Sequence, residues 1–305
     1  MKSRASRGGK FEHRKEAQGL QPLGFRCDHI NKGIVLSRIA AVFAALKQKQ
    51  QQAFMPFITA GDPDLPWTAR LVRELADSGA DLIEIGFPYS DPIADGPVIQ
   101  ASYTRALNQH IKLKDIFAEI GKVAPTVSTP LVAMVSYALI FRGGVETFVQ
   151  SAAKAGFAGL IVPDLPGDEA ETFAALVRQH GLDLIQLVAP TTPADRMARI
   201  VKNATGFVYC IAVAGTTGAR EGLAPELAEM LKTLRTQTDL PLCVGFGISQ
   251  PDQIRQLKGQ ADGIIVGSAI VRQMEALATD PENTVAQIRE FTKTMVNAAH
   301  AKSPS

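Results

Sequence analysis

Eight short apolar runs rich in Val, Ile and Leu recur along the chain, and amphipathic segments with helical spacing separate them. An apolar run bounded by Gly, Pro, Asp or Thr is typical of a strand buried on both faces, as in a parallel sheet covered by helices. Eight strand–helix units favour a closed α/β barrel, the (β/α)8 or TIM-barrel fold, with an open doubly wound sheet as the alternative. The expected strands lie at residues 54–59, 82–86, 131–136, 160–162, 184–188, 207–212, 242–246 and 263–266.

The segments on either side of the first expected strand refine this fold. An extra helix precedes that strand, because apolar side chains at 39, 42, 43 and 46 share one helical face. The strand then runs into the sequence TAGDP at 59–63, which lacks the G-x-G-x-x-G fingerprint of open dinucleotide-binding sheets. The missing fingerprint favours the barrel over the open sheet.

Composition and charge exclude several classes of protein. Lys and Arg total 32 against 30 for Asp and Glu, and a formal net charge of +2 is too balanced for a nucleic-acid or anionic-membrane partner. No stretch approaches the roughly 20 apolar residues that a membrane span requires. The three cysteines are far apart and lack C-x-x-C spacing, which argues against a disulfide framework and a zinc site and favours a cytoplasmic location. Cys210 and Cys243 lie in apolar runs, where we expect buried, unreactive side chains.

The histidines offer neither a metal site nor a general base. None of the five falls at an expected strand end, and no H-x-x-x-H or H-E-x-x-H spacing occurs. We therefore expect no bound metal and no base catalysis by histidine.

The first 36 residues differ from the rest of the chain. Basic residues such as Arg4, Arg7 and Lys10 recur there without sustained hydrophobic periodicity. No apolar segment follows the charges, as a secretory signal requires, and Glu12 and Glu16 argue against an organelle transit peptide. We expect a disordered basic extension over residues 1–36, to which no function is assigned, and one barrel domain over residues 37–305.

Glu84 stands out because it lies in an apolar run near the carboxyl end of the second expected strand. Barrel enzymes place their chemistry at this end of the strands. A buried carboxylate is costly, so Glu84 is either a structural group with a partner or a catalytic group whose pKa is raised by apolar surroundings. The Pro-rich loop that follows carries Asp91 and Asp95, each of which is either a turn former or a functional carboxylate.

Glycines follow the last three expected strands, at 215–218, 245–247 and 267. Glycine lets backbone N–H groups approach an anion closely, and the loops after strands seven and eight are the common phosphate site of barrel enzymes. We therefore expect a phosphorylated substrate. The hydroxyl of Tyr209, in the sixth expected strand, is either a hydrogen-bonding group of the site or a core aromatic with a satisfied hydroxyl.

Several motifs together resemble the tryptophan synthase α-subunit family. The segment EIGFPYSDPIADGPVIQ at 84–100 resembles the family signature, and PFITAGDP at 56–63 precedes it. Further matches follow in family order, namely IVPDLP at 161–166, GTTG at 215–218, GFGIS at 245–249 and GSAIV at 267–271. The matches extend from about residue 37 to the eighth expected unit.

The resemblance implies a lyase that splits indole-3-glycerol phosphate into indole and glyceraldehyde 3-phosphate by a retro-aldol step. It places Glu84 on the family's catalytic acid and base, Asp95 on its second catalytic carboxylate, and Tyr209 on a tyrosine of the active site. It also implies substrate contacts at Phe57, Tyr137, Thr217 and Phe246, and phosphate contacts at Gly218, Gly247, Gly267 and Ser268.

The resemblance also implies a partner. Family members form an α2β2 heterotetramer with a pyridoxal-phosphate-dependent β subunit, to which indole passes through a channel for condensation with serine to L-tryptophan. Pro88 and Asp91 would lie at that interface, and the loop at 212–225 would close over the substrate. Pyridoxal phosphate would bind the β subunit, and this chain would hold no cofactor.

The chain departs from the family pattern at three places. No asparagine follows Tyr137, Ala212 stands where serine is usual, and Thr216 stands where valine is usual. These changes bear on loop closure and on communication with the partner rather than on the expected acid, base or phosphate contacts. The alternatives are a phosphosugar isomerase or synthase of the same barrel type, a catalytically silent activator of a β subunit, and a free-standing lyase that releases indole.

Overall fold

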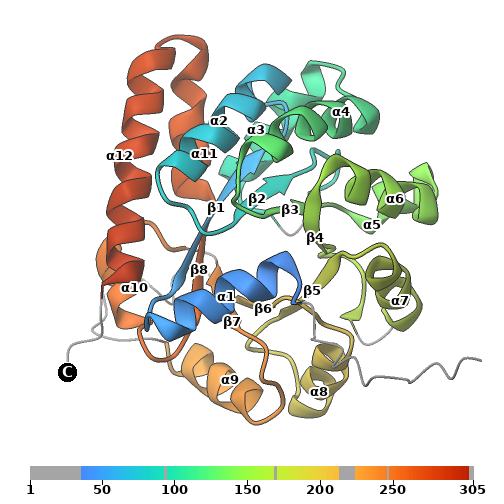
Figure 1. Cartoon of the computed structure of the whole chain (residues 1–305), viewed down its shortest axis with the longest axis vertical. Helices are drawn as coiled ribbons and strands as arrows, with labels where there is room; N and C mark the ends of the chain where they lie inside the picture. The colour runs from blue at the N-terminus through green and yellow to red at the C-terminus, as the bar shows by residue number, and fades with distance from the viewer. Residues whose placement is uncertain (1–35, 93–94, 168–169, 213–223, 246, 302–305) are drawn as a thin grey trace, which may run out of the picture. The chain divides into compact units, whose positions relative to one another are not determined.

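The computed structural model describes residues 36–92, 95–167, 170–212, 224–245 and 247–301. Eight parallel strands close into a barrel in chain order, with β1 paired to β8. Helices surround these strands (Figure 1), so the expected (β/α)8 barrel is confirmed. The strands are β1 (Ala53–Thr59), β2 (Ile83–Gly86), β3 (Leu131–Met134), β4 (Phe157–Ile161), β5 (Asp183–Val188), β6 (Val208–Ile211), β7 (Leu242–Gly245) and β8 (Gly263–Val266).

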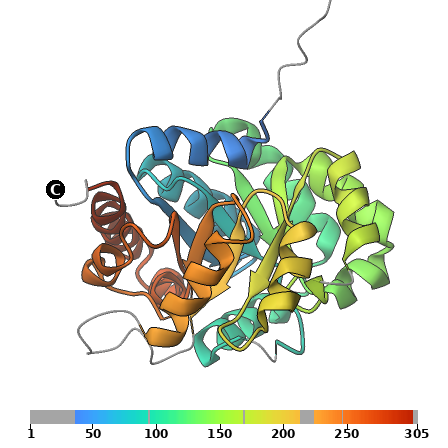
Figure 2. The ribbon, with the colours of Figure 1, turned by 90° about the horizontal axis from the view of Figure 1, so that it is seen from below.

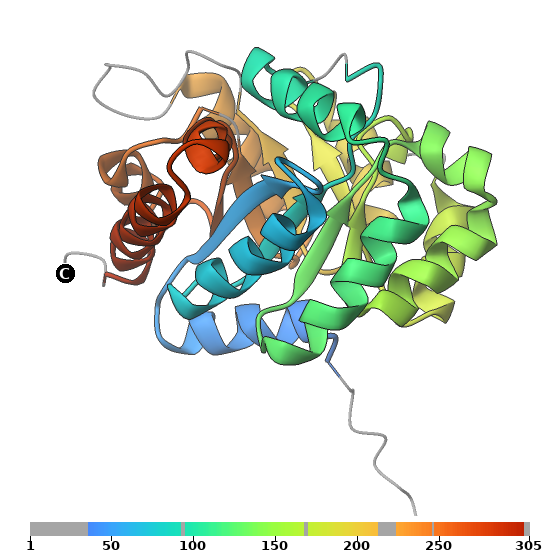
Figure 3. The same ribbon diagram turned by 90° about the horizontal axis from the view of Figure 1, so that it is seen from above.

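The helices alternate with the strands as the sequence pattern predicts, with additional helices after several strands. The longest, α12, packs against β1, α2 and α10 (Figure 3). The 3-10 turns Ala124–Thr126 and Glu275–Ala278 join neighbouring elements. The helices are α1 (Arg38–Gln48), α2 (Leu65–Asp77), α3 (Pro97–Asn108), α4 (Leu113–Val123), α5 (Tyr137–Gly143), α6 (Val145–Ala155), α7 (Glu171–Gln179), α8 (Ala194–Lys202), α9 (Pro225–Arg235), α10 (Pro251–Gln256), α11 (Ser268–Met274) and α12 (Pro281–His300).

The extra helix α1 covers the amino end of the barrel. Ser37 caps it by accepting a hydrogen bond from the Ala40 amide, and the same hydroxyl donates to Asp183 at the first residue of β5 (Ser37 Oγ to Asp183 Oδ2, 2.6 Å). The buried face of α1 places Phe43 against Phe207, the residue before β6. Views perpendicular to Figure 1 show α1 at one end of the barrel (Figures 2 and 3). The opposite, carboxyl end is left for a binding site.

Other sequence expectations have clear outcomes. Cys210 and Cys243 are buried and unpaired in β6 and β7, as predicted, and burial raises the pKa of the Cys210 thiol to about 12. No helix within the described ranges is long and apolar enough to cross a membrane. The expected basic extension lies outside the described residues, apart from Leu36.

A partly buried ion pair joins the loop after β1 to helix α3. Asp62, with 1% of its surface exposed, accepts hydrogen bonds from Arg105 at Nε (2.9 Å) and at a terminal nitrogen (2.7 Å). The Ser102 hydroxyl also donates to Asp62, at 2.6 Å. Because α3 begins two residues after Asp95, this clamp fixes the helix that carries the loop with the predicted catalytic aspartate.

Replacing Arg105 with alanine is expected to destabilise the fold. The change leaves the Asp62 carboxylate buried with only the Ser102 hydroxyl as a partner, and breaking a buried pair typically costs about 3–5 kcal/mol. Since the Arg105 side chain is about one-third exposed, we expect the free energy of unfolding to fall by roughly 2–4 kcal/mol. Urea unfolding measures this loss. The matched control is Arg255→Ala, which breaks an exposed pair with Asp252 and should cost less than about 1 kcal/mol. Equal losses in the two variants would contradict the clamp.

Candidate active site

Glu84 lies on β2, in register with Phe57 of β1 and Val132 of β3. Its side chain is buried, with 1% exposed, and neither carboxylate oxygen has a hydrogen-bond partner among the described residues. Burial and, secondarily, the nearby charge of Asp95 raise the pKa of Glu84 to about 8. A structural carboxylate would be held by a donor, so this geometry favours a group that exchanges protons.

Asp95 is held at the start of α3 by the loop that follows β2. Its amide donates to the carbonyl of Pro92 at 3.1 Å, and the Gln100 side-chain amide donates to the Asp95 carbonyl at 2.7 Å. These bonds engage the Asp95 backbone. The side chain is half-buried, and burial raises its pKa to about 6. Glu84 and Asp95 thus form a pair whose protonation changes on either side of neutral pH.

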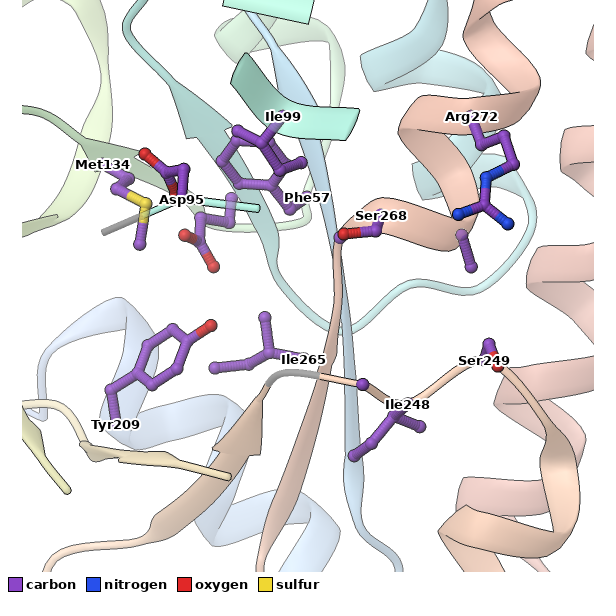
Figure 4. Close-up of a pocket in the computed structure, with 14 residues that line it drawn as sticks. Phe57, Asp95, Ile99, Met134, Tyr209, Ile248, Ser249, Ile265, Ser268 and Arg272 are labelled. Atoms are coloured by element: carbon purple, nitrogen blue, oxygen red, sulfur yellow. The ribbon is translucent and has the colours of Figure 1, made fainter. Parts of the chain in front are cut away.

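A cavity of about 270 Å³ opens at the carboxyl end of the barrel (Figure 4). Its volume is near the lower end of the range for small-molecule sites. Seven residues predicted from sequence line it: Phe57, Glu84, Asp95, Tyr209, Gly247, Gly267 and Ser268. The other seven lining residues were not predicted: Ile99, Met134 and Ile265 form apolar walls, Arg272 supplies a positive charge, and Ile248, Ser249 and Ala269 complete the lining.

Two glycines at strand ends make room for aromatic side chains of the site. A Cβ atom on Gly245 would lie 2.4 Å from the Tyr209 hydroxyl oxygen, and one on Gly86 would lie 2.4 Å from Cζ of Phe57. The hydroxyl of buried Tyr103 would lie 2.8 Å from that second Cβ. Burial raises the pKa of both tyrosines well above its usual value, with further contributions from the two carboxylates. Tyr103 was not predicted, because a tyrosine on a helix is typical of core packing.

The turn after β7 is organised by the side chain of Gln253. Its amide oxygen accepts from the backbone amides of Ser249 (2.8 Å) and Gln250 (2.9 Å), while its nitrogen donates to the Gly247 carbonyl at 3.2 Å. Gly247 has a φ of 76°, in the left-handed region that favours glycine. This turn and the start of α11 at Ser268 line the same side of the cavity. The predicted site residues Thr217, Gly218 and Phe246 lie outside the described residues.

Tyr137 lies outside this cavity, although the family resemblance implies a substrate contact. It begins α5, where its ring packs against Phe173 at a centroid distance of 5.8 Å. Its amide donates to Asp164 Oδ1 at 2.6 Å, and the Ser136 hydroxyl donates to Asp164 Oδ2 at 2.7 Å. The side chain of Tyr137 would have to move for a direct contact with a ligand in the cavity.

A second cavity of about 260 Å³ adjoins the first and shares Asp95 and Met134 with it. Asp91 lines this second cavity and accepts a hydrogen bond from the Ser90 hydroxyl at 2.7 Å, whereas Pro88 is buried and does not line it. Within the described ranges, no cluster of His, Cys, Asp or Glu is suited to a metal ion.

Comparisons with known proteins agree on one family. The model of the tryptophan synthase alpha chain family matches residues 43–300. The tryptophan synthase alpha chain of a Picosynechococcus strain is 45% identical over 264 residues, which cover 86% of this chain and 99% of the relative. That of a Rhodopirellula baltica strain is 44% identical over 262 residues, with 83% and 94% covered.

Solved structures give the same result. Tryptophan synthase subunit alpha from Legionella pneumophila has a TM-score of 0.79 and 35% identity, covering 87% of this chain and 98% of that chain. A chain of tryptophan synthase from M. tuberculosis, in an open form with BRD0059 bound, has a TM-score of 0.77 and 31% identity, with 87% and 99% covered.

Proposed function

The chain belongs to the tryptophan synthase alpha chain family, and from this membership we propose how its residues carry out the family's reaction. It is a lyase that cleaves indole-3-glycerol phosphate to indole and glyceraldehyde 3-phosphate in tryptophan biosynthesis. Family membership removes the alternative of a phosphosugar isomerase. The assignment of roles is carried by one observation, the pair Glu84 and Asp95 on a single cavity with the pKa values of both raised.

Glu84 acts as both acid and base in this proposal. The bond between indole C3 and the glycerol chain breaks poorly, because its electrons would have to stay on a carbon of an aromatic ring. Protonation of C3 by Glu84 gives an indolenine, which accepts those electrons as the bond breaks. Glu84 then takes the proton of the substrate hydroxyl, and the aldehyde forms. A carboxyl group with a pKa near 8 is protonated at neutral pH and can start this sequence.

Asp95 stabilises the positive charge that develops on the indole nitrogen. It does so by accepting the indole N–H, which requires an ionised carboxylate. Burial raises its pKa only to about 6, so it is mostly ionised at neutral pH, when Glu84 is still mostly protonated. Tyr209 and Phe57, which line the cavity, contact the substrate beside these carboxylates. The family resemblance adds contacts from Thr217 and Phe246, and from Tyr137 once its side chain has moved toward the cavity.

The phosphate of the substrate binds on the other side of the cavity. Gly247, Gly267 and Ser268 line this side. The family resemblance adds Gly218, which lies outside the described residues. Close approach of backbone N–H groups is possible there because glycine leaves the backbone uncovered.

A β subunit is the partner that we propose for this chain. Tryptophan synthase alpha chains pair with β subunits, and we propose an α2β2 heterotetramer in which pyridoxal phosphate resides on the β subunit. Asp91 would contact it, since Asp91 is exposed on the loop beyond Glu84 and lines the adjoining cavity. Pro88, which is buried, is assigned to this contact by the family resemblance alone. Indole would leave by this side, through a channel. We place this catalytic domain at residues 37–305, in the cytoplasm.

The experiment that tests the partnership measures indole release by the purified chain with and without a tryptophan synthase β subunit. Slow cleavage alone and strong acceleration by the β subunit, with tryptophan formed when serine is present, are the expected results. Fast cleavage that the β subunit does not change would indicate a free-standing lyase. Absence of cleavage by the chain, with tryptophan formed from added indole, would indicate a silent activator.

A further inference from the structure

The cavity has two ends of opposite charge. Glu84 and Asp95 lie at one end, and Arg272 is the one Lys or Arg among the described residues that line the cavity. Figure 4 shows Asp95 and Arg272 on opposite sides, with Ser268 between them. The substrate is complementary to this arrangement. Its indole ring, which becomes positively charged during the reaction, requires the carboxylates, and its negatively charged phosphate lies at the other end of the molecule.

The geometry of α11 directs Arg272 toward the phosphate side. Arg272 follows Ser268 by four residues, which is about one helical turn, and helical side chains lean toward the helix N-terminus. The guanidinium therefore extends back over the turn that begins at Ser268 (Figure 4).

The acidic residue nearest in the chain is already paired elsewhere. Glu275 lies one turn beyond Arg272 and forms an ion pair with Arg105 at 3.6 Å, and Arg105 also holds Asp62. Among the described residues, the Arg272 side chain forms no ion pair or hydrogen bond. A cation without a protein partner on the wall of a cavity is available for an anionic ligand.

We propose that the Arg272 guanidinium binds the phosphate of the substrate and makes the site selective for the phosphorylated compound. This inference rests on the proposed function and adds a residue to it. Two N–H groups of a guanidinium match two phosphate oxygens, a geometry that the ammonium of lysine does not reproduce. By binding the phosphate end, Arg272 also fixes the orientation in which the indole reaches Glu84. Because phosphate stays bound throughout the reaction, the contact lowers the KM rather than raising kcat.

The test compares Arg272→Gln with the unchanged chain. The KM for indole-3-glycerol phosphate should rise roughly 10–100-fold, the loss expected for one charged contact, while kcat changes little. The KM of Arg272→Lys should lie between those of the unchanged chain and Arg272→Gln, since lysine keeps the charge without the paired N–H donors. Arg178→Gln, on the exposed face of α7, is the matched control and should leave both constants unchanged.

A binding measurement separates charge recognition from simple packing. An unreactive indole-3-propyl phosphate and its phosphate-free alcohol are titrated into each variant by calorimetry. Arg272→Gln should weaken binding of the phosphate compound and leave binding of the alcohol unchanged. Added salt should lower the affinity for the phosphate compound less in this variant than in the unchanged chain. An unchanged KM, or equal weakening for both compounds, would overturn the role of Arg272. Neither outcome affects the proposed function, which fails only if the unchanged chain does not cleave the substrate.

Discussion

Replacing Glu84 with glutamine is expected to lower kcat for indole-3-glycerol phosphate cleavage by about 10²–10⁴-fold, the range typical of lost acid–base catalysis. Glutamine has nearly the same shape but neither donates a proton to C3 nor accepts one from the hydroxyl. Phosphate binding lies at the other end of the cavity, so the KM should change little. Steady-state kinetics with an indole readout measures both constants. A variant that keeps a tenth or more of the activity would contradict the role of Glu84.

The same variant should be more stable than the unchanged chain at alkaline pH. The pKa of Glu84 is raised in the folded state, so its protonated form favours folding below about pH 4.5, and this contribution is lost as pH rises toward 8. Glutamine stays neutral and avoids that loss, so the free energy of unfolding of the variant should exceed that of the unchanged chain by up to a few kcal/mol at alkaline pH. Urea unfolding at pH 5 and pH 9 measures the difference. Low activity together with higher alkaline stability separates a catalytic defect from misfolding.

Replacing Asp95 with asparagine is expected to lower kcat by roughly 10²-fold, comparable to the loss of one charged group that stabilises a transition state. Asparagine can still accept the indole N–H but lacks the negative charge that stabilises the positive ring. The matched control is Asp91→Asn on the same loop, which should leave cleavage by the chain alone nearly unchanged. Equal losses in the two variants would indicate damage to the loop rather than a role for Asp95.

The pH dependence of kcat/KM gives a second readout for this pair. Activity requires ionised Asp95, which is lost as pH falls through about 6, and protonated Glu84, which is lost as pH rises through about 8. The profile should therefore be bell-shaped with its maximum near pH 7. The alkaline limb is the cleaner one, because the substrate phosphate also titrates near pH 6. In Asp95→Asn the alkaline limb should move to lower pH, since the charge of Asp95 helps to raise the pKa of Glu84.

The fold was predictable because buried parallel strands leave an unmistakable apolar pattern. Strand boundaries were less predictable. β4 begins at Phe157, but its predicted start is residue 160 because Gly159 interrupts the apolar pattern. A Cβ on Gly159 would lie 2.8 Å from the side chain of Ile185 and 3.0 Å from that of Ile39, so close packing with β5 and α1 requires glycine. The third strand ends at Met134 because Ser136 caps the following helix. Such tertiary contacts are absent from local sequence patterns.

Glu84 was predictable as a site residue because a polar group there interrupts an apolar strand, whereas the role of Asp95 was predicted only by the family resemblance. Arg272 and Tyr103 were missed because they lie inside helices, where arginine is typical of an exposed face and tyrosine of the core. The spacing of four residues between Ser268 and Arg272 was a usable signal, since it places both on one helical face. No comparable pattern leads to Tyr103, which lines the adjoining cavity and whose hydroxyl lies in the space left by Gly86.

The most direct test of the proposed chemistry is a product balance for cleavage by the purified chain. Indole and glyceraldehyde 3-phosphate are measured as indole-3-glycerol phosphate is consumed, in parallel for the unchanged chain and Glu84→Gln. One equivalent of each product per substrate consumed, with turnover nearly abolished in the variant, is the predicted result. Unequal products, or equal turnover by the variant, would contradict a retro-aldol cleavage driven by Glu84.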